Sequence, residues 1–258
     1  MWIRAVFFHQ VGFGELNRQC SWITYYNTVV IDEKSCSGTP TVTDYEGNVY
    51  ATVQIGQQCW MRDNLRTRHY SDGIEIPIGT TSSANTSYYY NYSSSSIPLP
   101  QRGYLYNWSA VMHGASSSEA NPSGVQGICP IGWHVPSDAE WTLLTDYVKS
   151  QSDYVCGTNT NTIIAKSLAA TTEWNTCTNT CAVGNNLSNN NATGFSALPA
   201  GIYSNIGYLY SGYYTYFWST TDTSNSNAWY RSLSYVDVVV HRSSTNKYNG
   251  YSVRCLRD

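Results

Sequence analysis

The sequence predicts an α+β domain with few helices, short and mostly antiparallel strands, and long polar loops. Residues 49–55 alternate apolar and polar side chains, as a half-buried strand does, and a turn and a second short apolar run follow. Residues 137–148 carry the best-signalled helix. Residues 70–100 are rich in Ser, Thr, Asn, Tyr and Pro and show little periodicity, which is typical of a long loop.

The composition argues for a folded domain with an aromatic core and against a nucleic-acid-binding protein. The chain has 258 residues, enough for one large domain or two small ones. Only 12% of residues are charged and the net charge is −3, which argues against nucleic-acid binding. Nine Trp and 23 Tyr supply ample material for a core. The polar residues are mainly Ser, Thr, Asn and Tyr, a composition common in extracellular and virion proteins.

Targeting and membrane signals are weak. The apolar run over residues 1–8 is short and lacks a small-residue cleavage site, so no signal peptide is predicted. No stretch of about 20 apolar residues predicts a membrane span. Residues 1–35 have no clear period and are assigned to an N-terminal extension of unknown role, with strand-like pieces over residues 21–31.

The eight cysteines favour disulfides and an oxidising compartment. Buried free thiols are the alternative. Zinc is not predicted, because no second Cys or His pair accompanies Cys177 and Cys181 at the spacing of a zinc site. Eight cysteines allow 105 pairings, so spacing alone leaves the connectivity open.

The first predicted strands form a hairpin. Gly47 and Asn48 end a turn that begins at Thr43, Val49–Ile55 is the first strand, and Cys59–Met61 is its short partner after a turn at residues 56–58.

Helices are predicted in three places. Leu105, Trp108 and Met112 are spaced as one helical face, which predicts a short helix over residues 104–112. Ser137 and Glu140 form a capping box, and the apolar side chains that follow define a buried stripe. The stripe consists of Trp141, Leu144 and Val148. A further helix is predicted over residues 161–170.

The C-terminal part, residues 194–258, is read as a packed turn followed by strands. Tyr251, Val253 and Cys255 alternate with Ser252, Arg254 and Leu256, which predicts a closing strand. Within residues 217–258, scaffold-like residues alternate with Ser, Tyr, Asp, His and Thr. Binding surfaces use such mixtures of rigid rings and small hydrogen-bonding groups, so this stretch is the candidate recognition segment.

Several motifs carry a family resemblance. They are Asn48–Tyr50, Ile55–Met61, Asn64–Leu65, Tyr104–Trp108, Cys129–Ser137 with Glu140 and Trp141, and Gly250–Cys255. In this order they resemble the Fibrobacter succinogenes major paralogous domain over residues 36–258. The resemblance implies a C-type-lectin-like fold, with two helices, a small twisted sheet and long loops. Cys129 and Cys255 lie in these motifs and are expected to form a disulfide.

The C-terminal stretch is also similar to the variable proteins of diversity-generating retroelements, which place a hypervariable segment at this end of the fold. In these proteins mutagenesis replaces adenines, and an Asn codon can then become a codon for Ser, Tyr, Asp, Thr, Val or His, but not for Lys, Glu, Gln, Met or Trp. The residues between the fixed positions, at about 217–250, obey this restriction. The resemblance implies that the following residues bind a ligand: Tyr230, Ser232, Ser234, Val236, Asp237, Val238, Val239, His241, Ser243, Ser244, Thr245 and Tyr248.

This resemblance implies a non-enzymatic binding protein without a cofactor or metal. The expected partner is a protein or a surface glycan on another cell, and display on a cell surface or a virion is expected. Tyr230, His241 and Tyr248 are the expected largest contacts, because aromatic residues dominate interfaces. The oligomeric state and the ligand stay open.

Alternatives are kept for each reading. The C-terminal residues can be an ordinary sheet edge, and Val236, Val238 and Val239 can belong to a buried strand.

A carbohydrate-binding lectin-like domain would need calcium-binding triplets, which the sequence lacks. A relative of formylglycine-generating enzymes would use reactive cysteines. His134 is expected to be a hydrogen-bonded structural histidine. Trp108, Trp133, Trp141 and Trp218 are assigned to the core, and Trp229 is the best candidate for sugar stacking.

Overall fold

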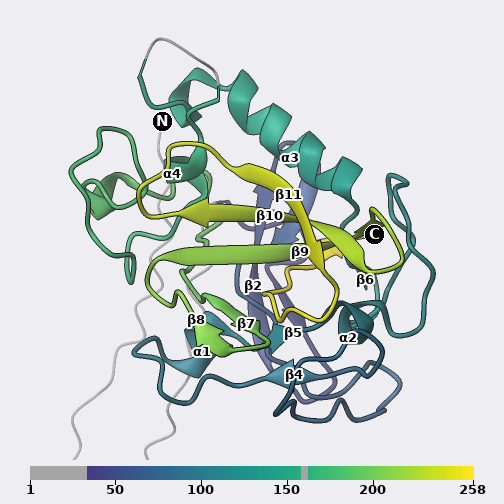
Figure 1. Cartoon of the computed structure of the whole chain (residues 1–258). Helices are drawn as coiled ribbons and strands as arrows, with labels where there is room; N and C mark the ends of the chain where they lie inside the picture. Colours follow the sequence, from purple (N-terminus) through teal and green to yellow (C-terminus); the bar gives the residue numbers. More distant parts are fainter. Residues whose placement is uncertain (1–33, 158–161) are drawn as a thin grey trace, which may run out of the picture. The chain divides into compact units, whose positions relative to one another are not determined.

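The computed structural model describes residues 34–157 and 162–258, and within them the fold is α+β, as predicted (Figure 1). The predicted N-terminal extension lies outside the described residues, apart from its last two. Most of the described chain is loop, and the predominantly antiparallel strands curl around two hydrophobic clusters. None of the helices in the described parts of the chain has the length and hydropathy needed to cross a membrane.

A five-stranded antiparallel sheet contains both ends of the domain. Its strand order is β1-β2-β3-β12-β6. The strands are β1 (Thr41–Thr43), β2 (Val49–Ile55), β3 (Gln58–Met61), β12 (Leu256–Arg257) and β6 (Trp133–His134). The predicted hairpin of β2 and β3 is confirmed. Strand β12 lies between β3 and β6, where Leu256 pairs with both Trp60 and His134.

A second, three-stranded antiparallel sheet holds the C-terminal segment. It consists of β9 (Tyr214–Asp222), β10 (Asn227–Ser234) and β11 (His241–Asn246), with β10 in the middle. Two short ribbons complete the strands: β4 (Tyr89–Tyr90) with β5 (Leu105–Tyr106), and β7 (Ile202–Ser204) with β8 (Gly207–Leu209).

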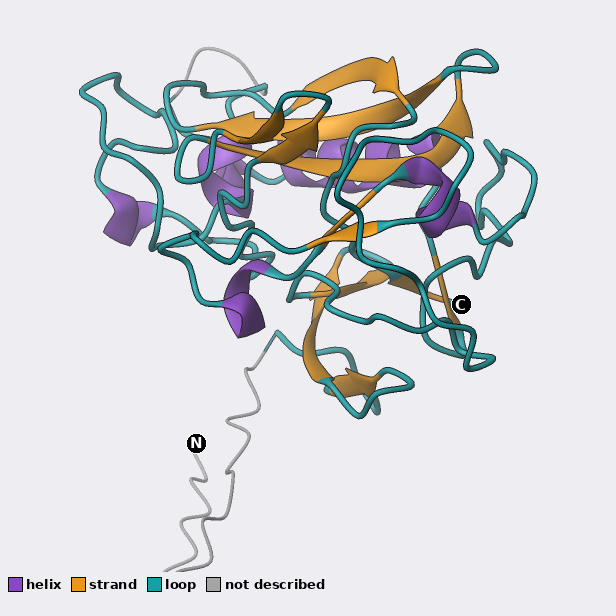
Figure 2. Cartoon of the chain, turned by 60° about the horizontal axis from the view of Figure 1, so that its bottom comes forward, coloured by secondary structure: helices purple, strands orange, loops and turns teal. Residues whose placement is uncertain are grey.

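The main helix, α3 (Asp138–Ser150), has the predicted capping box, because Ser137 and Glu140 bond each other's main-chain amides. Figure 2 shows α3 against one face of the three-stranded sheet. The predicted stripe of Trp141, Leu144 and Val148 is buried, and it packs in a cluster with Phe217 and Leu233 of that sheet. The other helical segments are α1 (Leu99–Arg102), α2 (Trp108–Met112), α4 (Ala165–Leu168) and the 3₁₀ turns η1 (Ser152–Tyr154) and η2 (Leu187–Asn189).

Two predicted helices are shorter than expected. The helix over residues 104–112 begins only at Trp108, because Asn107 caps it by accepting a bond from the Ala110 amide, and residues 105–106 pair with β4 instead. The helix over residues 161–170 is one turn, α4. It ends there because the Ala170 amide bonds the Ala197 carbonyl, so the chain leaves the helical path.

The predicted closing strand is present but shorter than expected. Residues 251–256 are buried at every position, the polar Ser252 and Arg254 included, and only residues 256–257 form a strand. Arg254 is satisfied by the Asn64 side chain and the carbonyls of Phe195 and Ser196. These hydrogen bonds compensate for the burial of the Arg254 guanidinium. Period-2 alternation does not predict that Arg254 is buried, because its partners lie far away in the sequence.

Three disulfides join the described cysteines: Cys36–Cys59, Cys129–Cys255 and Cys156–Cys181. The expected pairing of Cys129 with Cys255 is confirmed, and it ties the segment before β6 to the segment before β12. Cys177 is a free thiol among the described cysteines, whereas Cys20 lies outside the described residues. The four Trp residues assigned to the core are all buried.

Candidate binding surface

The face of the three-stranded sheet opposite α3 is rich in tyrosine. Residues paired across antiparallel strands point to the same side. Ser232 pairs with both Tyr216 and His241, and Tyr230 pairs with Ser243. Because side chains alternate along each strand, the buried Trp218 and Ala228 share this side with eight further residues. We call the eight the tyrosine face: Tyr214, Tyr216, Tyr230, Ser232, Ser234, His241, Ser243 and Thr245.

The rings of the tyrosine face support one another. The Tyr230 ring lies edge-on to Tyr216, with 5.6 Å between centroids, and edge-on to Tyr251, at 5.2 Å. Burial, and then the neighbouring Tyr230, raise the pKa of the Tyr216 hydroxyl well above its ordinary value. The Tyr216 hydroxyl therefore remains a neutral hydrogen-bonding group at physiological pH. Rings fixed in this way lose little conformational entropy when they contact a partner.

The structure brings half of the twelve predicted binding residues to the tyrosine face. They are Tyr230, Ser232, Ser234, His241, Ser243 and Thr245. His241 and Ser243 are exposed, whereas Tyr230 and Thr245 are half-buried. Ser232 and Ser234 are buried, at 6% and 1% exposure, which the sequence analysis does not anticipate. The assignment of these residues to a binding set stays a prediction.

The other six predicted residues lie off this face. Ser244 pairs with Trp229 and points toward the α3 side of the sheet. Tyr248 is half-buried in the turn after β11. The remaining four are half-buried in the loop that joins β10 to β11, which we call the hairpin loop, residues 235–240: Val236, Asp237, Val238 and Val239.

The hairpin loop is docked through its main chain. Four successive carbonyl groups, of residues 235–238, accept hydrogen bonds from a neighbouring segment. The donors are the amides of Gly184, Val183 and Ala165 and the side chain of Asn179. The Cys177 thiol also donates to the Tyr235 carbonyl. Because every residue type has a carbonyl, this docking does not depend on which side chains the loop carries.

The segment that holds the hairpin loop is itself fixed. The Cys156–Cys181 disulfide anchors it, and the buried Lys166 ammonium bonds the carbonyls of Ala182, Asn185 and Asn186 and the side chain of Asn190. Gly184 lies so close to this junction that a Cβ would be 2.4 Å from the Asn175 carbonyl oxygen and 2.9 Å from that of Tyr235. Only glycine fits there without a shift of the main chain.

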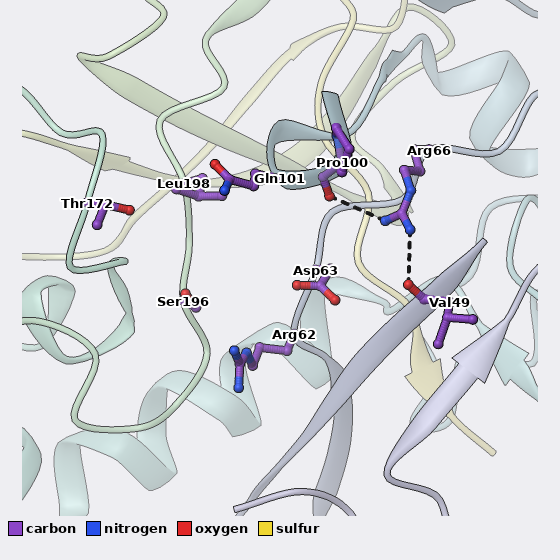
Figure 3. Close-up of a pocket in the computed structure, with 9 residues that line it drawn as sticks. All are labelled: Val49, Arg62, Asp63, Arg66, Pro100, Gln101, Thr172, Ser196 and Leu198. Atoms are coloured by element: carbon purple, nitrogen blue, oxygen red, sulfur yellow. Dashed lines mark hydrogen bonds between the residues drawn. The ribbon is translucent and has the colours of Figure 1, made fainter. Parts of the chain in front are cut away.

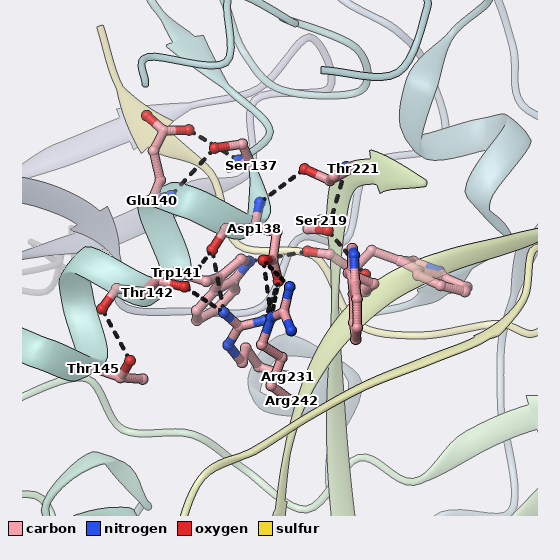
Figure 4. A network of polar contacts seen from close by, with 12 residues as sticks. Ser137, Asp138, Glu140, Trp141, Thr142, Thr145, Ser219, Thr221, Arg231 and Arg242 are labelled. Atoms are coloured by element: carbon pink, nitrogen blue, oxygen red, sulfur yellow. Dashed lines mark hydrogen bonds and ion pairs between the residues drawn. The ribbon is translucent and has the colours of Figure 1, made fainter. Parts of the chain in front are cut away.

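The opposite face of the sheet is fastened to α3 by one carboxylate. Figure 4 shows Arg231 of β10 and Arg242 of β11 converging on Asp138. Burial raises the pKa of Asp138, but bonds from Arg242 and Arg231 outweigh it, so the pKa lies below its ordinary value. Asp138 is therefore ionised and holds both strands to the start of the helix.

Trp229 has one ring face already occupied. The Arg242 guanidinium carbon lies 3.6 Å from the ring centroid, as in a cation–π contact. Sugar stacking at this tryptophan is therefore limited to what remains of its surface, and the tyrosine face lies on the other side of the sheet.

The histidines and acidic residues of the described chain do not gather into a metal centre. No group of three or more His, Cys, Asp or Glu side chains within residues 34–157 and 162–258 is placed to hold a metal ion. His134 is buried and its ring nitrogens lie 2.6 Å from an Asp258 oxygen and 2.8 Å from a Glu140 oxygen. The predicted structural role of this histidine matches that geometry.

The sequence analysis missed Tyr214 and Tyr216, which line the same face from β9. Both precede the segment that was examined as variable. Their i, i+2 spacing before the buried Trp218 is the local signal that places them on one side of a strand. The side of the sheet on which Tyr214 and Tyr216 lie depends on how β9 pairs with β10, and sequence periodicity does not predict that pairing.

The chain was compared with known families and proteins. A family model described as the Fibrobacter succinogenes major domain matches residues 53–257. No curated protein and no solved structure matches the chain significantly.

Proposed function

Because the chain belongs to the Fibrobacter succinogenes major domain family, we propose that it is a non-enzymatic ligand-binding protein. Its scaffold is C-type-lectin-like, and its C-terminal segment is the variable segment of a diversity-generating retroelement. The tyrosine face and the hairpin loop bind a protein or a surface glycan on another cell. The disulfides support an extracellular place of action, on a cell or a virion.

One observation supports this proposal most strongly. The hairpin loop is held by four carbonyl groups, and Tyr235 and Val240 at its ends pack against the second hydrophobic cluster, so the side chains of Val236, Val238 and Val239 between them are not needed for this docking. Substitution at exposed or half-buried positions away from special contacts costs within about 0.5 kcal/mol of stability. Such a loop can carry different side chains on one main-chain path, which a diversified binding protein needs.

The test is deep sequencing of the coding region for residues 200–258 in the source population. We expect changes to concentrate at the twelve predicted positions. Trp229, Arg231, Arg242 and residues 250–255 should stay constant. Uniform sequences, or changes spread equally over anchoring and binding positions, would contradict diversification.

A carbohydrate-binding lectin-like domain without diversification is the second candidate. The observation in its favour is the set of tyrosine rings on one sheet face, because an aromatic ring can contact the apolar face of a sugar. A glycan array probed with the full chain and with a Tyr230→Ala variant tests it. Binding that depends on Tyr230, in a population with a uniform C-terminal sequence, would favour this candidate. Kinship with formylglycine-generating enzymes stays an alternative without a specific observation in its favour.

A further inference from the structure

A cavity of about 300 Å³ lies away from the predicted binding segment, and arginine and aspartate side chains both line it (Figure 3). It is lined by Val49, Arg62, Asp63, Arg66, Pro100, Gln101, Thr172, Ser196 and Leu198. We propose that this cavity binds a small zwitterion, such as a free α-amino acid with an apolar side chain. The volume is at the lower end of the range for small-molecule sites, roughly 300–1,000 Å³.

The two charges arise where β3 stops. The Arg62 amide still donates to the Ala51 carbonyl, and beyond Arg62 side chains rather than main chain bond the edge of β2. The Asp63 carboxylate accepts the Ala51 amide at 2.8 Å, and the Arg66 guanidinium donates to the Val49 carbonyl at 3.0 Å. Two residues of a strand span roughly 6.6 Å. Strand β2 therefore sets the separation of the positive and the negative group.

Arg66 is fixed before any ligand arrives. It also donates to the Pro100 carbonyl at 3.3 Å, and its guanidinium lies over the Tyr50 ring, 4.6 Å from the centroid. These bonds use two of the five N–H groups of a guanidinium, so donors remain for a carboxylate. A side chain that is already ordered loses little entropy on binding.

Asp63 and Arg66 do not neutralise each other. Among the residues that the structure describes, no ion pair joins them, although both line the same cavity. A ligand with one negative and one positive group would contact both by charge-assisted hydrogen bonds, which are stronger than neutral ones. A simple anion would meet the Asp63 carboxylate, and a simple cation would meet Arg66 and Arg62, which also lines the cavity.

The rest of the lining suits an amino acid. Val49, Pro100 and Leu198 offer apolar contact, and Gln101, Thr172 and Ser196 offer neutral hydrogen-bonding groups. Ser196 has φ +56°, a backbone conformation that non-glycine residues adopt at a cost, and its carbonyl is held by the buried Arg254. The main chain at Ser196 is therefore held in place by Arg254 on this side of the cavity.

The experiment uses three related probes and the full chain. Binding of L-leucine, L-leucinamide, which lacks the carboxylate, and N-acetyl-L-leucine, which lacks the ammonium, is measured by NMR shift titration. We expect leucine to bind and each analogue to bind at least about tenfold more weakly. Equal binding of N-acetyl-leucine would reveal a general anion site, and no shift with any probe would show an unused cavity. Either result overturns the proposal.

Two variants assign the charges. Asp63→Asn keeps an acceptor for the Ala51 amide, so we expect a fold close to the original and about tenfold weaker leucine binding. N-acetyl-leucine binding should not weaken, since it has no ammonium to lose. Arg66→Gln should weaken leucine binding but leave leucinamide unaffected. Arg68→Gln is the matched control, because Arg68 is exposed and pairs with Glu46 outside the cavity. Equal losses for all probes in Asp63→Asn would contradict the assignment.

Discussion

At the scale of single residues, His134 couples stability to pH. Burial alone would lower the pKa of His134, but hydrogen bonds to Glu140 and Asp258 raise it above 6.5. The folded state therefore holds the proton more tightly than the unfolded state does. This stabilisation is complete below pH 6.5 and is lost as the pH rises through the raised pKa.

We predict that the contribution of His134 makes the free energy of unfolding fall as the pH rises above 6.5. Denaturant unfolding at a series of pH values, for the original chain and for His134→Gln, measures this contribution as the difference in slope. Parallel curves for the original chain and His134→Gln would contradict the prediction.

The two arginines on Asp138 differ in burial, and their substitutions should differ in cost. The Arg231 side chain is 3% exposed and that of Arg242 is 47% exposed. Breaking a buried ion pair costs about 3–5 kcal/mol, whereas an exposed pair is worth about 0–1 kcal/mol. We predict that Arg231→Met destabilises the fold by about 3 kcal/mol and Arg242→Met by about 1 kcal/mol or less. Similar losses in chemical denaturation would show that the exposed Arg242 stabilises the fold as much as the buried Arg231 and would contradict the prediction.

At the scale of elements, the hairpin loop and its support should respond differently to substitution. Gly184→Ala changes no loop side chain, but its Cβ would strike the Asn175 and Tyr235 carbonyl oxygens. We expect it to cost more than 1 kcal/mol and to speed hydrogen exchange at the amides of Val183 and Gly184. Val238→Thr changes a loop side chain and keeps the carbonyl bond, so exchange there should be unchanged. Equal exchange in both variants would refute main-chain docking.

The elements that sequence predicts well are those fixed by local chemistry. The hairpin of β2 and β3 follows from alternation and a turn, and α3 follows from the Ser137 capping box. The closing strand is shorter than predicted, and Arg254 and Ser252 before it bond partners 58 or more residues away in sequence, which periodicity does not reveal. The helix expected at residue 104 fails because pairing with β4 outweighs helical spacing.

The candidate site shows the same division. Tyr230, His241 and Ser243 could be picked by residue type and placement, and they do share one face. Tyr214 and Tyr216 could not, because their membership of that face is set by the register of β9 against β10. The burial of Ser232 and Ser234 also depends on which larger rings flank them. The cavity near Asp63 depends on where β3 stops, which the sequence does not mark.

At the scale of the whole molecule, the Cys129–Cys255 disulfide joins residues 126 apart, whereas Cys156 and Cys181 are 25 apart. Cross-links that close longer loops restrict the unfolded chain more. We predict that replacing both Cys129 and Cys255 by Ala costs roughly 2–5 kcal/mol, and about 1 kcal/mol more than replacing Cys156 and Cys181. Paired denaturation curves measure the difference. A larger loss for the Cys156 and Cys181 pair would mean that loop support outweighs chain entropy.

Strand β12 lies between β3 and β6, inside the first sheet, although it comes last in the described chain. During synthesis on the ribosome, β3 and β6 emerge early but cannot be joined until residues 256–257 have left the exit tunnel. A premature stop or a frameshift within residues 217–250 removes the strand that closes this sheet. Every copy that completes its fold has therefore been translated, in frame, through the entire segment that is proposed to vary. Chains with a stop codon or a frameshift in that segment cannot close the first sheet.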